Sequence, residues 1–152
     1  MNRRLKQAAV VFVFVFAAAQ FVPPERANPA TDVGRTIQAH GGTTSGLVAV
    51  LDRACNDCHS NETVWSRYTQ IAPVSWLIAS GVSQGRKAVN FSEWAEYSPE
   101  RQRMLLVQSC QDASAGKMPG RPYTMLRPDA RLSNEDVATI CAASQSSLEG
   151  RR

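Results

Sequence analysis

The sequence lacks the patterns that would indicate β-structure or a repeat architecture. No stretch of strand length alternates between apolar and polar residues, and there is neither an internal repeat nor a low-complexity block. Helical periodicity is the pattern that remains. The sequence therefore predicts an all-α fold in which short helices are joined by long loops.

An excess of charge is also missing once the first residues are set aside. The full chain has 17 basic and 13 acidic residues, which gives a net charge of +4. Arg3, Arg4 and Lys6 lie in residues 1–19, which hold no acidic residue, so the remainder carries a net charge of +1. No basic stripe is left that could bind nucleic acid, and we exclude that class of partner.

Residues 1–22 have the features of an export signal. Basic residues precede a run of twelve apolar residues from Ala8 to Ala19, and the small residues at its end suit cleavage before Gln20. Phe21 and Val22 extend the apolar run, so an uncleaved membrane anchor is the alternative. That longer run would reach only about 22 Å, against a hydrocarbon core of about 30 Å. We expect export, and both interpretations of the segment stay open.

Four segments of the remaining chain have helical periodicity or helix-capping residues. They are residues 47–54, residues 74–82, a helix from Ser98-Pro99 to just before Gly116, and a helix from Ser133 to about residue 141. Residues 23–42 are rich in Pro, Asn, Thr and Gly and are interpreted as a linker or surface extension. The folded unit is therefore expected over residues 43–145.

The motif Cys55-Asn56-Asp57-Cys58-His59 is the most specific feature of the sequence. Cysteines at i and i+3 on a helical turn face the same side. C-x-x-C-H is the spacing at which both thiols bind one c-type haem, with His59 as the proximal iron ligand. A redox dithiol would need a βαβ context, and a zinc site would need Cys110 and Cys141 as a second pair. A simple Cys55–Cys58 disulfide would leave the histidine unexplained.

Residues 55–65 and the segments after them resemble a known family, the small haem-binding domain of exported, cytochrome c-like bacterial proteins. The resemblance covers about residues 20–140 and implies a helical domain around one covalent haem c. It departs at Ser66-Arg67, where the family usually has Pro-Trp, and at Arg127, where it usually has His. The other matching motifs are Ala72-Pro73-Val74-Ser75-Trp76, Gly85-Arg86, Asn90-Phe91-Ser92-Glu93-Trp94, Met118-Pro119, Tyr123 and Pro128-Asp129-Ala130-Arg131-Leu132-Ser133.

The sixth ligand of the iron is predicted to be Met118. It lies in a loop rich in Gly and Pro, where Pro119 restricts the backbone before it and displays the side chain. A methionine thioether opposite histidine suits electron transfer. The alternatives are a Met118 that only fills a gap in the core, an open position, or His40, Met104 or Met125 as ligand.

Aromatic and basic side chains near these motifs are predicted to complete the haem pocket. Flat apolar partners would wall the macrocycle, and cations would pair with its propionates. Ordinary core packing and solvated arginines are the alternatives. The predicted aromatic residues are Trp65, Trp76, Phe91, Trp94 and Tyr123, and the predicted cations are Arg67 and Arg86.

Cys110 and Cys141 are predicted to form a disulfide. The even number of cysteines, the oxidising compartment and the position of both residues on helices favour it. Two buried thiols, which pack like small hydrophobic groups, are the alternative.

Two classes of function compete. The first is an electron carrier, located in the periplasm or on the outer face of the inner membrane, that exchanges single electrons with a redox partner protein. The second is a peroxidase-like enzyme or gas sensor with an open sixth position. The enzyme is disfavoured because the sequence offers no distal constellation of His or Arg that can be placed over the haem. A structural haem protein is the third hypothesis.

Overall fold

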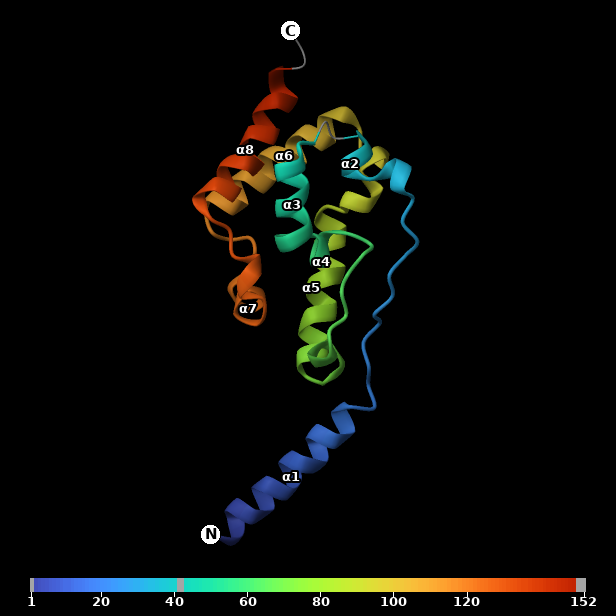
Figure 1. The fold of residues 1–152 in the computed structure, drawn as a ribbon. Helices are drawn as coiled ribbons and strands as arrows, with labels where there is room; N and C mark the ends of the chain where they lie inside the picture. The colour runs from blue at the N-terminus through green and yellow to red at the C-terminus, as the bar shows by residue number, and fades with distance from the viewer. Residues whose placement is uncertain (1, 41–42, 150–152) are drawn as a thin grey trace.

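The all-α prediction is confirmed. The computed structural model describes residues 2–40 and 43–149, the last three of these as main chain only, and within them it has eight α-helices, four 3-10 helices and no strand (Figure 1). The elements, in order, are α1 (Arg3–Ala19), η1 (Val33–Arg35), α2 (Ile37–His40), α3 (Ser45–Ala54), α4 (Asn56–His59), η2 (Arg67–Gln70), α5 (Val74–Ala88), η3 (Phe91–Glu96), α6 (Pro99–Ser114), α7 (Arg121–Leu126), η4 (Pro128–Ala130) and α8 (Asn134–Glu149).

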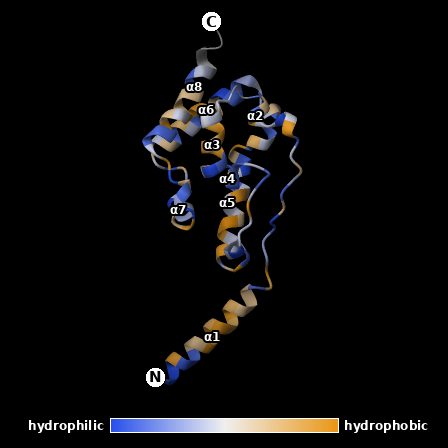
Figure 2. Cartoon of the chain, in the orientation of Figure 1, coloured by the Kyte–Doolittle hydropathy of each residue, from blue (hydrophilic) through white to orange (hydrophobic). Residues whose placement is uncertain are grey.

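Helix α1 stands apart from the other helices. It projects from one end of the molecule and is joined to the rest by an extended segment, whereas α8 lies at the opposite end (Figure 1). No residue of α1 is buried, and Figure 2 shows most of its length as hydrophobic. None of the helices in the described part of the chain is both long and apolar enough to cross a membrane.

The core forms where α3, α6 and α8 pack together and where η3 closes against α2. The predicted apolar stripe of α3 is confirmed, because Leu47, Val50, Leu51 and Ala54 are all buried. Burial of such side chains is worth about 1.5–3 kcal/mol each for the larger ones. This stripe fixes the direction in which the chain enters the Cys55 motif.

The predicted starts of α6 and α8 are also confirmed. The Ser98 hydroxyl accepts from the main-chain N–H of Arg101, with Pro99 at the first helical position. At α8 the hydroxyl of Ser133 accepts from the N–H of Asp136 (3.1 Å), and the carboxylate of Asp136 accepts from the N–H of Ser133 (2.7 Å). This reciprocal capping box operates with Asp in the place of the usual Glu.

Helix α5 is longer than predicted. The sequence suggested an end near residue 82 because Gly81 and Gly85 lie close to that point, but the helix continues through both glycines to Ala88. Gly81 has open space around it, and a helix tolerates such a glycine at a cost of about 1 kcal/mol. Gly85 is retained in the helix for a packing reason described below.

The segment 23–42 is not only a linker. Its residues 33–40 form η1 and α2, and Ile37 is fully buried in the same core cluster as Trp94. Arg35 pairs with Glu96 of η3 at 2.8 Å. The folded unit therefore begins before residue 43, because a single buried isoleucine and an ion pair hold this part of the segment to η3.

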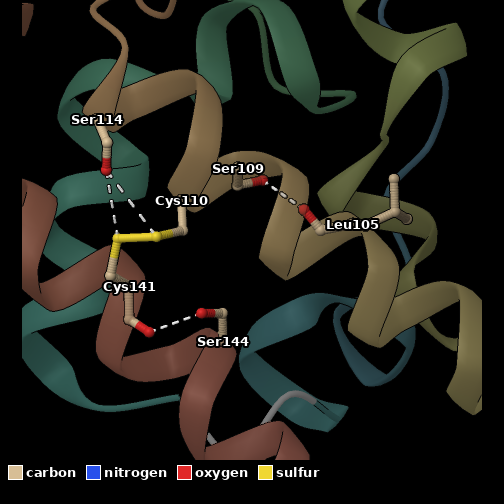
Figure 3. Close-up of a disulfide and its surroundings, with 6 residues drawn as sticks. All are labelled: Leu105, Ser109, Cys110, Ser114, Cys141 and Ser144. Carbon is tan, nitrogen blue, oxygen red and sulfur yellow. Dashed lines mark hydrogen bonds between the residues drawn. A yellow bond between two sulfur atoms is a disulfide. The ribbon is translucent and has the colours of Figure 1, made fainter.

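A disulfide joins α6 to α8, as predicted (Figure 3). The Cα atoms of Cys110 and Cys141 lie 4.7 Å apart. The Ser114 hydroxyl lies 3.6 Å from the sulfur of Cys141 and must be the donor, since a disulfide sulfur carries no hydrogen. The cross-link holds together the two helices that form one wall of the cavity described next.

Candidate functional site

The site begins where α3 ends. Cys55 leaves the helical conformation at the end of α3, and α4 restarts at once, with the N–H groups of Cys58 and His59 donating to the carbonyl of Cys55 at 3.1 and 3.0 Å. This short turn brings the side chains of Cys55, Cys58 and His59 to one cavity. The arrangement is the one expected from the i, i+3 spacing.

This cavity has a volume of about 190 Å³ and a mostly apolar wall. Residues from α3, α4, α5, η3, α6, α8 and the loop 118–120 contribute to it, so almost every element of the domain converges there. A mostly apolar cavity with a few convergent polar groups is the usual form of a cofactor site. Its walls include the predicted residues Phe91, Met118 and Tyr123 together with Leu51, Val89, Leu105, Leu132 and Ile140.

The two thiols of the motif are free and protonated at neutral pH. Burial raises the pKa of Cys55 to about 12 and the pKa of Cys58 to about 11. Cysteines of redox dithiol sites have lowered pKa values, so this pair is poorly suited to thiol–disulfide exchange. A zinc ion held by all four cysteines is excluded as well, because Cys110 and Cys141 are bonded to each other.

The ring of His59 is oriented by a main-chain carbonyl. Its Nδ1 lies 3.2 Å from the carbonyl oxygen of Val89, which can only accept, so Nδ1 carries the proton and Nε2 a lone pair. Burial lowers the pKa of His59, which favours the neutral ring. A neutral imidazole with one nitrogen fixed by a carbonyl is the usual form of a histidine that ligates a metal.

A buried network of polar side chains holds Val89 in place. Asn90 donates through Nδ2 to the side-chain oxygen of Asn61 (2.8 Å), and the hydroxyl of Ser92 accepts from the N–H of Asn61 (3.0 Å). Tyr97 accepts through its hydroxyl from the N–H of Asn90 (2.9 Å). These bonds join the loop after His59 to η3, and they explain the Asn90-to-Trp94 motif as a scaffold of the site.

Asp57, the third residue of the motif, connects α4 to α7. Its Oδ2 accepts from the Tyr123 hydroxyl (2.7 Å) and from Nη1 of Arg127 (2.9 Å), while Oδ1 accepts from the N–H of Val64 (3.1 Å). Burial and the bond to Asp57 raise the pKa of Tyr123, so its hydroxyl stays protonated and donates. Sequence reasoning did not identify Asp57 or Arg127; the departure of Arg127 from the family pattern was the one available indication.

Met118 lies in the loop between α6 and α7 and borders the same cavity as His59. The N–H groups of Lys117 (2.9 Å) and Met118 (3.3 Å) both donate to the carbonyl of Asp112, which anchors the loop to the end of α6. The other candidate ligands, His40, Met104 and Met125, do not border this cavity. His40 is exposed, and its ring contacts the carbonyl of Gly34.

All three predicted tryptophans lie elsewhere. Trp65 and Trp76 border a second cavity, between α5 and the segment 24–29. The indole N–H of Trp65 donates to Asn28 (3.0 Å), and that of Trp76 donates to the carbonyl of Val22 (2.7 Å). Trp94 is buried in the core, edge-on to Tyr97, and does not border the cysteine cavity.

Arg86 is committed to the protein itself. Its guanidinium donates to the carbonyls of Ser60 (2.7 Å) and Ala27 (2.8 Å) and to the side chains of Asn28 (2.9 Å) and Thr63 (2.8 Å). Four hydrogen bonds use most of its five donors. Arg86 therefore clamps the loop after the motif to the N-terminal segment, and Arg67 is exposed outside the cavity.

A family model described as a haem-binding domain matches residues 14–145, which includes all of the segment 23–42. Comparison with curated proteins and with solved structures gave no match.

Proposed function

Since the chain belongs to the haem-binding domain family, we propose that it is an exported c-type cytochrome that carries one covalent haem and transfers single electrons. The match confirms the resemblance that the motifs predicted. The covalent attachment, the export and the electron-transfer role go beyond the family match and form the proposal.

One observation carries the proposal: two protonated thiols and a neutral, oriented imidazole border a single apolar cavity. This donor set fits a haem c. Cys55 and Cys58 would each add their S–H across one vinyl group, which forms two thioether bonds and releases nothing. His59 would supply Nε2 to the iron, with its other nitrogen fixed by Val89.

A haem with two axial protein ligands supplies one-electron redox chemistry, and its ligands set the reduction potential. In this protein the walls of the cavity are mostly apolar, and the Asp112 carbonyl anchors the loop that carries Met118. We propose Met118 as the distal ligand, because among the methionines in the described part of the chain it is the one that borders the cavity of His59. The second candidate function is a gas-binding or peroxidase-like site, in which Met118 leaves the sixth position open.

Export would place the protein in the periplasm or on the outer face of the inner membrane, with residues 1–22 as signal peptide or anchor. The disulfide between Cys110 and Cys141 supports this location, since such bonds persist in oxidising compartments. A redox protein is the expected partner.

Carbon monoxide distinguishes the two candidate functions. We expect the reduced protein to keep its absorption spectrum when carbon monoxide is added, because Met118 occupies the sixth position. Met118→Ala should bind carbon monoxide readily and have a lower reduction potential. Met125→Ala, on the exposed face of α7, serves as the control and should behave like the wild type. Ready binding of carbon monoxide by the wild type would contradict the electron-carrier assignment.

A further inference from the structure

Helix α1 has no protein cover. Seven consecutive apolar side chains, from Val10 to Phe16, are 42–71% exposed. Seven residues make about two helical turns, so this part of α1 is hydrophobic on every side. A soluble protein rarely exposes an apolar surface of this kind unless another molecule covers it.

The end of α1 is fixed to the domain at one place. The side chain of Gln20 accepts from the N–H of Ala72 (3.0 Å) and donates to its carbonyl (3.4 Å). The carbonyl of Val22 accepts from the indole N–H of Trp76 (2.7 Å). These bonds hold the chain that leaves α1 against the N-terminal end of α5.

Exposed apolar side chains gather at the same place. Phe21 and Val22 follow α1 directly, and Ile71 and Leu77 flank the start of α5, with Leu77 72% exposed. Trp76 lies between them with its ring partly exposed. We call Phe21, Val22, Ile71, Trp76 and Leu77 the basal face; it lies at the end of α5 nearest α1, opposite α8 (Figure 1).

We propose that the basal face rests on a lipid bilayer whose apolar layer takes up α1. The proposal rests on the proposed export and on the anchor interpretation of residues 1–22, because cleavage before Gln20 would remove α1. It assigns an orientation to the folded domain: α5 stands with its first turn on the lipid, and α8 lies away from it.

Lipid fits this face better than a protein partner for two reasons. The face is continuous with an uncovered apolar helix, so one apolar medium covers both. Trp76, with an apolar ring and a satisfied N–H, is the residue type that collects at membrane interfaces. Arg67 lies exposed near the same end in η2, where it suits anionic headgroups.

Spin labels on the full chain test the proposal. With haem on Cys55 and Cys58 and a bond between Cys110 and Cys141, Leu77→Cys supplies the one reactive thiol. Val33→Cys is the matched control. Val33 is a similarly exposed apolar residue (78%), and it lies in η1, away from the basal face. Each labelled protein is reconstituted with vesicles of phosphatidylcholine and phosphatidylglycerol, and collisions of the nitroxide with oxygen and with a water-soluble nickel chelate are compared.

We expect the ratio of oxygen to nickel collisions to be several-fold higher at position 77 than at position 33. Equal ratios, or a chain that does not associate with the vesicles, would overturn the proposal, as would a label at 77 that becomes shielded only when another protein is added. The covalent haem of the same samples is measured separately. Covalent haem without lipid contact overturns the orientation and leaves the proposed function standing. If covalent haem is absent, the labels are placed in a Cys55→Ser/Cys58→Ser background, so that position 77 or 33 again supplies the one reactive thiol; lipid contact then supports the orientation, while the missing haem overturns the proposed function.

Discussion

The main chain of Gly85 in α5 lies directly against the carbonyl group of Cys58. A Cβ atom at position 85 would collide with that carbonyl and would lie 3.2 Å from the Cβ of Cys58. The backbone of the proposed attachment turn is therefore packed on a helix with no room for a side chain, which ties the geometry of the site to the position of α5.

Gly85→Ala should destabilise the protein and disturb the cavity. Because the colliding atoms are backbone, α4 or α5 must shift, at a cost of about 1–3 kcal/mol. Chemical denaturation measures the change. The control is Gly81→Ala in the same helix, where nothing lies within 4 Å of the added carbon; it should be neutral or stabilise by about 0.5–1 kcal/mol. Equal effects of the two substitutions would contradict the packing argument.

Removal of the disulfide should lower the stability without removing the haem. The double variant Cys110→Ala/Cys141→Ala opens a loop whose closure is worth about 3–4 kcal/mol on the chain-entropy model. Denaturant unfolding measures the loss, and Ser114→Ala, which keeps the bond, should change little. Two alkylatable thiols at these positions in the native protein would show that the bond is absent.

Asp136→Asn should weaken the start of α8 in a pH-dependent way. The N–H of Ser133 and then the guanidinium of Arg53 hold the pKa of Asp136 below its usual range. The folded protein thus favours the charged carboxylate, and this stabilisation is present above the unfolded value, about pH 4, and is lost as the pH falls through the folded value. We expect the free energy of unfolding of the wild type to exceed that of the variant by about 1 kcal/mol at pH 7, and this difference to disappear as the pH falls below about 4. A difference that stays constant between pH 7 and pH 3 would argue against the role of the charge.

The bonds of Asp57 to α7 should control access to the cavity. Tyr123→Phe combined with Arg127→Gln removes both donors to one carboxylate oxygen, which should lower the free energy of unfolding by about 1–2 kcal/mol. In a Met118→Ala background, which opens the sixth position, a loosened α7 should also speed the binding of carbon monoxide to the reduced protein, measured by flash photolysis. Arg121→Gln, on the exposed side of α7, is the control. Unchanged rates of carbon monoxide binding in the double variant would show that α7 does not control access to the cavity.

Local patterns in the sequence predicted the parts of the fold that local chemistry determines. The caps at Ser98 and Ser133 and the buried stripe of α3 follow from spacing alone. The disulfide followed from the number of cysteines and the compartment. The extension of α5 through Gly85 did not, because that glycine serves a contact with Cys58, 27 positions earlier in the chain.

The parts of the site that depend on tertiary contacts could not be predicted in this way. Trp76 has the aromatic chemistry expected of a pocket wall, yet its position on α5 turns it toward Val22. Ile37 is one apolar residue in a polar segment, and such a segment gives no periodicity to indicate burial. Asp57 became part of the site only through α7, which lies 66 residues further along the chain at Tyr123.

The most direct test of the account is a haem stain after denaturation. The protein, expressed with a cytochrome c maturation system, is run on a denaturing gel and stained for haem peroxidase activity, beside the variant Cys55→Ala/Cys58→Ala. We expect a stained band for the wild type and none for the variant, although both proteins are present at equal amounts. A wild-type band without stain, or a stained band in the double variant, would contradict the assignment of Cys55 and Cys58 as the haem attachment site.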